Sequence, residues 1–304
     1  MNTEIQSMLK QWKKEKEASK QVASAGIWQA RIQNLIKYNA YRKKVLAKLG
    51  FFPRNAQITV TTFWGHEMKV LARNPDVMLF DGKIDSYEMK LAFYFIKNLK
   101  PDDVFYDVGS HYGFYSILAS KFIDAAKGEI HAFEPQPQVF DVLSKNIGGL
   151  GRHACANNMA VSNKEGESEF YIDMRSSGAS TLLPSVAKLR RNEAPLEKTT
   201  VKTTTLDKYV EDGHRPPSIM KVDVEGAELS VIMGAERTLA DKRPIVTLEL
   251  WEHYSLSAAE KMIEYGYTPH FISHNGATLK ADLDDIKSAI DAGLTDNLVF
   301  KPKG

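Results

Sequence analysis

Acidic side chains stand at the ends of several predicted strands of this chain. The five strand ends are Asp107-Val-Gly109, Glu134-Pro135, Asn158–Ser162, Asp223-Val-Glu225-Gly226 and Glu249-Leu-Trp251-Glu252-His253, and four of the five carry an acid. In open α/β sheets, ligands bind at the carboxyl ends of the strands. Unpaired carboxylates are costly to bury, so core packing would not place acids there. The pattern therefore indicates a ligand site whose carboxylates accept hydrogen bonds and take up a proton.

The turn after the first of these strands is the centre of the predicted site. Residues 104–108 form a short apolar and aromatic run, typical of a buried strand, and a helical pattern begins at Phe114. Between them stands Gly109-x-x-x-Gly113, whereas a dinucleotide site has G-x-G-x-x-G. The turn leaves less room for a pyrophosphate and suits a ligand with an amino-acid end, such as S-adenosylmethionine. Taken alone, the stretch also fits an ordinary strand-to-helix turn.

Glu134 is the most diagnostic acid. It lies 25 residues after Gly109, at the end of the next predicted strand. A carboxylate at this place can accept hydrogen bonds from both hydroxyls of a ribose, as in dinucleotide folds. The alternative is an acid at the start of a helix that faces solvent. Because the glycine turn stands in the right place, we favour ribose binding.

Length and composition indicate a globular protein. A chain of 304 residues fits one large domain, or one domain with an extension. No apolar run reaches the length of a membrane span, and residues 1–20 lack the apolar centre of a signal peptide. The single Cys155 excludes an internal disulfide, and we expect it to be a packed strand residue. These features predict a cytoplasmic protein.

The charge is uneven along the chain. Residues 1–54 carry twelve Lys/Arg and three Asp/Glu, a net charge of +9, although the whole chain carries +2. Their apolar residues follow two helical stripes, which must be covered by the main domain or by another copy of the chain. The basic segment could contact nucleic acid, an anionic membrane or an acidic partner, but a solvated helical face is the favoured interpretation.

Strands and helices alternate through the rest of the chain. A hairpin is predicted around Trp64-Gly65-His66, followed by an edge strand at 77–80 and a helix over 86–99. The further predicted strands are 104–108, 129–133, 155–161, 167–172, 199–205, 219–224, 245–250, 267–272 and 298–301. The further predicted helices are 137–147, 257–265, one from Phe114 and one from about Glu225. This order indicates an α/β fold with a mainly parallel, doubly wound sheet.

Five motifs together resemble one protein family. They are Asp107-Val-Gly-Ser-His-Tyr-Gly113, Phe133-Glu-Pro135, Ala160-Val-Ser162, Thr205-Leu-Asp207 and Lys221-Val-Asp-Val-Glu-Gly-Ala-Glu228, with Glu249 in support. In this order they look like the FkbM family of S-adenosylmethionine-dependent methyltransferases, over about residues 85–272. The resemblance implies a Rossmann-like class I methyltransferase fold, whose seven-stranded sheet has an antiparallel last strand. It also implies O-methylation of a hydroxyl on a saccharide or other small metabolite.

The charge and the helical stripes predict a basic N-terminal helical extension (1–54) before the methyltransferase domain (55–304), in which 55–84 form a hairpin lead-in. The resemblance also implies roles for single residues. Asp107, Gly109 and Gly113 would line the methionine end of the cofactor, and Glu134 would hold the ribose. Pro135, Asn158 and Ala160 would flank the adenine, whereas Asp223, Glu225 and Glu228 would face or support the acceptor pocket. The chain departs from the family pattern at Ser110, His111 and Tyr112. Of these, Ser110 and His111 are still placed in the cofactor site, where His111 could contact the cofactor through a ring N–H, and Asp223 is placed there as well.

Methyl transfer to a hydroxyl requires a group that removes the proton. The candidates are Asp223, which the strand order favours, then Glu225, His253 and His111. Asp223 and Glu249 could also share a magnesium ion, as some related enzymes do with a third acid. That third place is Leu250 here, so metal dependence is not favoured.

Two other functions stay open. A nucleic-acid methyltransferase could use the basic segment to bind phosphates, but the chain lacks an N-P-P-Y motif and a second lysine in the catalytic strands. A non-catalytic scaffold could use residues 1–54 for assembly as a homo-oligomer. The intact Gly109, Gly113 and Glu134 argue against the scaffold.

Overall fold

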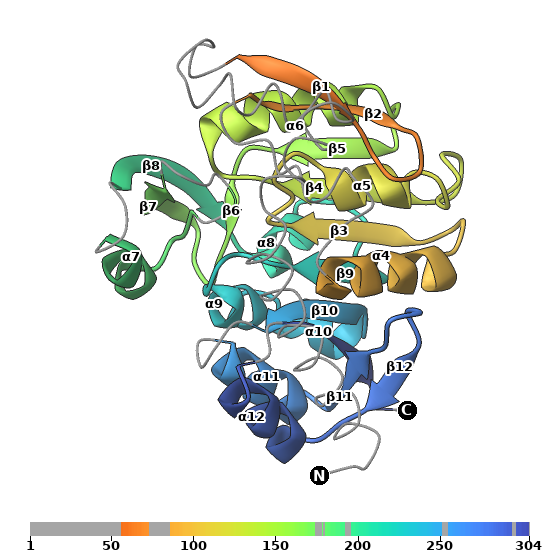
Figure 1. Cartoon of the computed structure of the whole chain (residues 1–304), viewed down its shortest axis with the longest axis vertical. Coiled ribbons are helices and arrows are strands. Elements are labelled where there is room, and N and C mark those ends of the chain that lie inside the picture. The colour runs from red at the N-terminus through yellow and green to blue at the C-terminus, as the bar shows by residue number, and fades with distance from the viewer. Residues whose placement is uncertain are drawn as a thin grey trace, which may run out of the picture. The chain divides into compact units, whose positions relative to one another are not determined.

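A computed structural model describes most of the chain (Figure 1). The described residues are 56–72, 86–173, 178, 180–191, 196–250, 255–293 and 296–303. The predicted N-terminal helices, the boundary at residue 54, the edge strand at 77–80 and His253 lie outside them. The chain divides into two compact units, residues 1–85 and 86–304.

The described part of the first unit is a β-hairpin. Strands β1 (Gln57–Thr61) and β2 (Glu67–Leu71) pair antiparallel, with Ile58 opposite Val70. The turn between them is closed by hydrogen bonds from the backbone of Gly65 to Thr62 and from Thr62 to His66. Buried residues alternate along both strands, so the apolar side chains share one face. The hairpin predicted from the Trp64-Gly65-His66 turn is confirmed.

The second unit is built around a central eight-stranded sheet. Its order is β12-β11-β13-β10-β9-β3-β4-β5. The strands are β3 (Val104–Val108), β4 (Glu129–Phe133), β5 (Ala154–Asn157), β9 (Ile219–Val222), β10 (Ile245–Leu250), β11 (Tyr267–Ile272), β12 (Thr278–Lys280) and β13 (Asp296–Pro302). The five strands from β5 to β10 run parallel, whereas β13 is antiparallel to both of its neighbours.

Helices cover both faces of this sheet (Figure 1). From β3 the chain moves outward through α5 (Phe114–Ala119), β4, α6 (Pro137–Gly148) and β5, and α4 (Ser86–Asn98) packs beside α5. The chain then returns to β9, on the other side of β3, and continues through the sheet in the opposite direction. Connections between parallel strands are right-handed, so this reversal places the later helices on the other face. Those helices are α8 (Leu206–Glu211), α9 (Glu228–Met233), α10 (Glu236–Asp241), α11 (Leu256–Glu264) and α12 (Leu283–Asp291).

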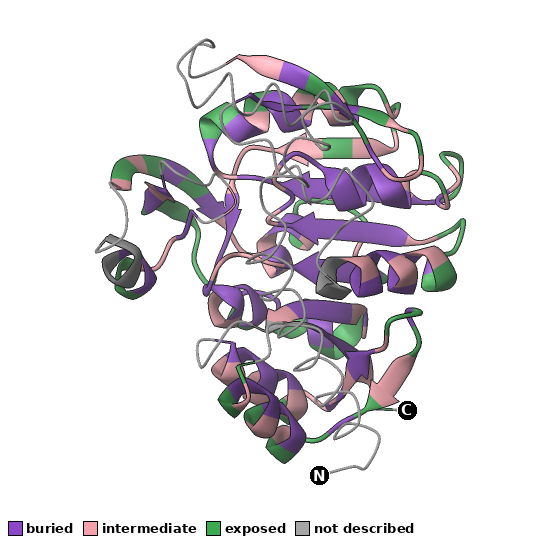
Figure 2. Ribbon diagram, viewed as in Figure 1, coloured by how far each residue is buried: buried purple, intermediate pink, exposed green. Residues whose placement is uncertain are grey.

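The direction of winding changes between β3 and β9, at the centre of the sheet. A ligand crevice forms outside the carboxyl ends of strands at such a switch point. Both strands are buried along their whole length, as Figure 2 shows for β3. The ends of both strands are therefore held by the core, and the residues of the site lie in the turns that follow them.

A smaller three-stranded sheet is inserted between β5 and β9. It has the order β6-β8-β7, with β6 (Ala160–Val161), β7 (Gly166–Asp173) and β8 (Leu196–Thr204). Its own core contains Ala160, Phe170 and Val201. Helix α7 (Pro184–Arg191) lies between β7 and β8 in the chain.

The structure corrects several predictions. The central sheet of the described part of the chain has eight strands rather than seven, because a turn at Asn275-Gly276 adds β12 beside β11. The strand predicted at 155–161 is split into β5 and β6, which join different sheets. Cys155 is exposed rather than packed, because β5 is the edge strand.

Helix α9 begins at Glu228, not near Glu225 as predicted. Glu225 and Gly226 both have positive φ, 56° and 98°, which is incompatible with a right-handed helix. Helices α7, α8, α10 and α12 were not predicted. No helix of the described residues is long and apolar enough to cross a membrane.

Candidate active site

The turn after β3 is fastened to the neighbouring strand β4. The backbone N–H groups of Gly109 and Ser110 both donate to the carbonyl of Phe133, at 3.1 and 3.0 Å. The Ser110 hydroxyl donates to the same oxygen at 3.1 Å. Gly109 has φ 76°, and a Cβ there would lie 1.8 Å from the backbone oxygen of Asp223. Only glycine permits this approach between the two central strand ends.

Gly113 ends the turn and precedes helix α5. Its φ is 87°, and a Cβ there would lie 2.8 Å from Leu143 of helix α6. Its N–H donates to the carbonyl of Ser110 at 2.7 Å, which closes the turn. Both glycines singled out from the sequence thus occupy positions that require glycine.

Glu134 connects the glycine turn to helix α6. Its Oε2 accepts the backbone N–H of His111 at 3.1 Å, and its Oε1 accepts that of Gln136 at 2.8 Å. The residue is 7% exposed. Burial raises the pKa of the Glu134 carboxyl to about 7, although the two N–H groups act in the opposite direction. The side chain stands at the end of β4, as predicted.

Asn158 fixes the segment that follows Glu134. Its Nδ2 donates to the carbonyl oxygens of Glu134, at 2.9 Å, and of Pro135, at 3.2 Å. Ala160, in contrast, is buried in β6 within the core of the three-stranded sheet. The structure therefore brings Pro135 and Asn158 together beside Glu134 and places Ala160 in a core.

A buried lysine lies beneath the site. Asp107 and Lys221 are opposite each other on β3 and β9, with Asp107 Oδ1 and Lys221 Nζ 3.6 Å apart. Lys221 Nζ also lies 3.2 Å from Oδ2 of Asp223 and donates to the Gly109 carbonyl at 3.1 Å. Asp107 is fully buried, and its Oδ2 accepts the Ser116 hydroxyl at 2.6 Å. Burial raises the pKa of Asp107, whereas Lys221 and Ser116 act to lower it.

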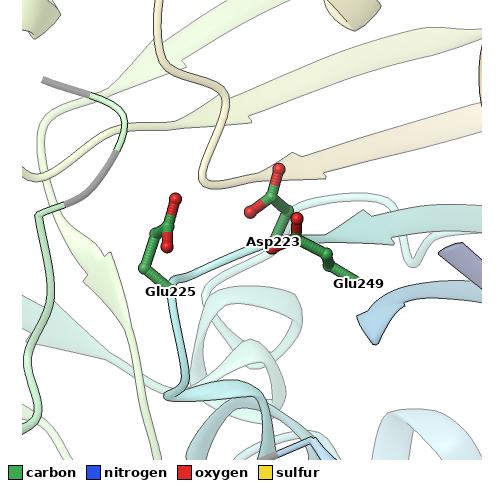
Figure 3. Close-up of side chains that lie close together, drawn as sticks. All are labelled: Asp223, Glu225 and Glu249. Carbon is green, nitrogen blue, oxygen red and sulfur yellow. The ribbon is translucent and has the colours of Figure 1, made fainter. Parts of the chain in front are cut away.

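Three carboxylates lie close together at the carboxyl ends of β9 and β10. Figure 3 shows Asp223, Glu225 and Glu249, each of which offers an oxygen within 4.8 Å of the others. All three are half-buried. The pair of acids predicted for a metal was Asp223 and Glu249, with Leu250 in place of a third acid; here Glu225, from the turn, is the third acid of the cluster. That metal dependence is not favoured stays a prediction from the sequence.

The turn that carries Glu225 is held in place from two sides. Oε1 of the buried Glu228 accepts the backbone N–H groups of Val224 and Gly226, both at 3.2 Å. Burial raises the pKa of Glu228 to about 7. From the three-stranded sheet, the Thr181 hydroxyl donates to the Glu225 carbonyl at 2.9 Å. Glu228 therefore supports the pocket through its backbone contacts.

His111, the last of the candidate bases, lies in the glycine turn. Burial lowers the pKa of its imidazole to about 4, with Asp223 opposing this effect and Lys221 acting in the same direction as burial. The advantage that an imidazole with its usual pKa has as a base near pH 7 is therefore lost. His111 lies half-buried in the turn with φ 50°, and its backbone N–H contacts Glu134.

Sequence analysis assigned no role to Lys221 or Thr181. A lysine in the middle of an apolar strand is itself a signal, because an unpaired charge there would be costly. Thr181 stands in a polar loop and carries no such signal.

The Thr205-Leu-Asp207 motif has a structural role. The Thr205 hydroxyl accepts the N–H of Lys208 at 3.0 Å and caps helix α8. Asp207 accepts the N–H groups of Arg237 and Thr238, at 2.9 and 2.8 Å, and the Thr238 hydroxyl at 2.7 Å. The motif thus joins α8 to the start of α10 rather than lining the site.

A mainly parallel sheet with an antiparallel β13, wound in both directions from β3 and β9, defines the class I methyltransferase fold, with its site at the switch point. Here β12 adds a second antiparallel strand at the edge of the sheet. The model of the Methyltransferase FkbM domain matches residues 107–280, more than half of the chain. The chain belongs to the FkbM methyltransferase family.

Two curated relatives are named as methyltransferases. The hexuronic acid methyltransferase AglP of Haloferax volcanii is 30% identical over 145 residues, covering 47% of this chain and 54% of that protein. The methyltransferase sdnD of Sordaria araneosa is 28% identical over 189 residues, covering 52% of this chain and 70% of that protein. The chain therefore spans about half the length of the first relative.

Among solved structures, the methyltransferase FkbM of Methylobacillus flagellatus is similar to this chain. It has 13% sequence identity and a TM-score of 0.43, covering 66% of this chain and 44% of that chain.

Proposed function

We propose that the protein is an S-adenosylmethionine-dependent O-methyltransferase that acts on a hydroxyl of a saccharide or other small hydroxylated metabolite. Membership of the FkbM family and the site at the ends of β3, β4 and β9 support this function. The saccharide is suggested by the printed name of one relative, a hexuronic acid methyltransferase.

The observation that carries the proposal is the environment of Glu134. An ionised carboxylate has about four acceptor positions. The N–H groups of His111 and Gln136 use two of them and fix the orientation of the group. The remaining positions suit the two hydroxyls of a ribose, so the residues present fit the cofactor. When bound, S-adenosylmethionine supplies an electrophilic methyl group on a sulfonium.

The other cofactor residues follow from the same geometry. In this proposal the turn from Gly109 to Gly113, with Ser110 and His111, holds the amino-acid end through its backbone. Asp107 acts from beneath the turn, because it is fully buried. Pro135 and Asn158 flank the adenine, and Ala160 supports that side from the core of the small sheet.

Asp223 is proposed to remove the proton of the acceptor hydroxyl. Its side chain is 26% exposed and stands directly after β9, next to the glycine turn. Glu225 and Glu249 lie beside it and complete a cluster of acids at the ends of β9 and β10. Glu225 is the second candidate, and His253 stays a prediction from the sequence.

A screen with radiolabelled cofactor tests this function. Purified protein would be incubated with methyl-labelled S-adenosylmethionine and a panel of uronic acids, neutral sugars and polyols. Transfer to at least one hydroxyl acceptor, lost in Asp223→Asn, is the expected result. A wild type that binds the cofactor but methylates only amines or nucleic acid would contradict the acceptor class.

A further inference from the structure

Lys221 has surroundings that set it apart from the surface lysines of the chain. Its side chain is 4% exposed, in the middle of the buried strand β9. Lysine is almost never fully buried unless it is paired. Its Nζ reaches three groups on two strand ends: the Asp223 carboxylate, the Gly109 carbonyl and the Asp107 carboxylate. The ring of Tyr115 lies 5.4 Å from the same Nζ.

The two carboxylates need this ammonium for different reasons. Asp107 is fully buried, and its Oδ1 accepts no hydrogen bond from the described residues, so Lys221 offsets a buried charge. Asp223 is partly exposed and lies beside Glu225 and Glu249, whose carboxylates repel it. The ammonium of Lys221 attracts the Asp223 carboxylate and also contacts the Gly109 carbonyl of the glycine turn.

We propose that Lys221 is a positioning residue that clamps the Asp223 carboxylate to the Gly109 carbonyl. The acid on the acceptor side and the turn on the cofactor side then keep one relative arrangement. The inference rests on the proposed function, because it places the sulfonium end of the cofactor next to Asp223. A carboxylate held there favours the cationic S-adenosylmethionine over its neutral product, S-adenosylhomocysteine.

A purely structural role for Lys221, as counter-charge of Asp107 alone, makes a different prediction. Lys221→Met keeps an unbranched side chain but leaves Asp107 buried and unpaired, which destabilises a fold. The double variant Asp107→Asn/Lys221→Met removes one acid and one base together. Its net charge equals that of the wild type, and the amide oxygen at position 107 can still accept from Ser116. The contacts of Lys221 with Asp223 and with the Gly109 carbonyl are lost, but no buried charge is left at position 107.

Calorimetric titration of both ligands separates the two roles. S-adenosylmethionine and S-adenosylhomocysteine would be titrated into the wild type, Asp107→Asn and the double variant, with thermal unfolding of each. Lys208→Met is the matched control, because Lys208 pairs with Asp212 at the surface. In the double variant we expect a midpoint of unfolding near that of the wild type. Compared with Asp107→Asn alone, we expect its preference for the sulfonium ligand over the product to be about tenfold lower.

An unchanged preference in a folded double variant would overturn the clamp, as would the same loss in Asp107→Asn alone. If the double variant does not fold, a cycle with Asp223→Asn provides the test. Introduced into the wild type, Lys221→Gln should lower the preference for S-adenosylmethionine over S-adenosylhomocysteine. Introduced into Asp223→Asn, it should have little effect; equal losses in the two backgrounds would contradict the proposal. A wild type that binds neither ligand would instead overturn the proposed function.

Discussion

The backbone oxygen of Asp223 lies 1.8 Å from the point where a Cβ of Gly109 would stand. The two residues follow the central strands β3 and β9, one on each side of the switch point. Their contact brings the turn of the proposed cofactor site and the proposed base together. The close approach of the two backbones therefore sets the distance between the turn and the base.

Gly109→Ala tests this contact. The new methyl group would meet a backbone atom that cannot move without β9, so we expect a loss of several kcal/mol of unfolding free energy or no folded protein. Gly213→Ala is the matched control, because Gly213 also has a positive φ, 98°, but nothing within 4 Å of its Cβ position. It should cost about 1–2 kcal/mol. Similar losses in the two variants, measured by denaturant unfolding, would contradict the importance of the contact.

The raised pKa of Glu134 predicts how cofactor binding depends on pH. Ribose hydroxyls donate to the ionised carboxylate, whose pKa of about 7 leaves it largely protonated in mildly acidic solution. Affinity for S-adenosylmethionine should therefore be full above pH 7 and fall about tenfold for each pH unit below it. Calorimetry between about pH 5.5 and about pH 7.5 measures this dependence. Glu134→Gln should bind the cofactor weakly at every pH, without this pH dependence. Glu228→Gln should retain the pH dependence of the wild type.

Replacement of the proposed base should affect catalysis more than cofactor binding. Asp223→Asn removes the proton acceptor and should lower the rate of methyl transfer about 100-fold to 10,000-fold at saturating cofactor. Glu225→Gln keeps Asp223 and should cost about tenfold or less. Rates are to be measured with the acceptor found in the screen. A larger effect of Glu225→Gln would reverse the assignment of the two acids.

Asp207 should matter for stability and not for binding. Three hydrogen bonds from Arg237 and Thr238 end on its carboxylate, so Asp207→Ala should lower the unfolding free energy by roughly 2 kcal/mol. Affinity for the cofactor should not change. Asp212→Ala at the surface is the control and should have an effect within about 0.5 kcal/mol. Weakened cofactor binding in Asp207→Ala would indicate that the motif takes part in the site.

Sequence alone was sufficient for several strands of the central sheet. The predicted ranges 129–133, 245–250 and 267–272 are those of β4, β10 and β11, because each is a short run rich in apolar, β-branched or aromatic residues with clear ends. Helices α8 and α10 have only six residues each, too few to show a periodic pattern. Helix α8 begins at its cap, Thr205. The start of α10 is fixed by Asp207 of α8, which accepts hydrogen bonds from Arg237 and Thr238.

The site was predictable to the extent that strand ends define it. Gly109, Glu134 and Asp223 stand where the sheet rule places them, because each directly follows a strand that could be recognised. Contacts between distant segments could not be predicted. The contacts of Lys221 with Asp107 and with the Gly109 carbonyl require the register of β3 with β9. The contact of Thr181 with Glu225 requires the position of a loop that bridges to β7.

The most direct test of the account is calorimetric titration of S-adenosylmethionine into the wild type and Glu134→Ala near pH 7.5. We predict binding in the micromolar range by the wild type and an affinity about 100-fold lower in the variant, since two charge-assisted hydrogen bonds are lost. Glu211→Ala, a change at the surface, should bind as the wild type does. A folded wild type that does not bind the cofactor, or equal affinity in Glu134→Ala, would contradict the account.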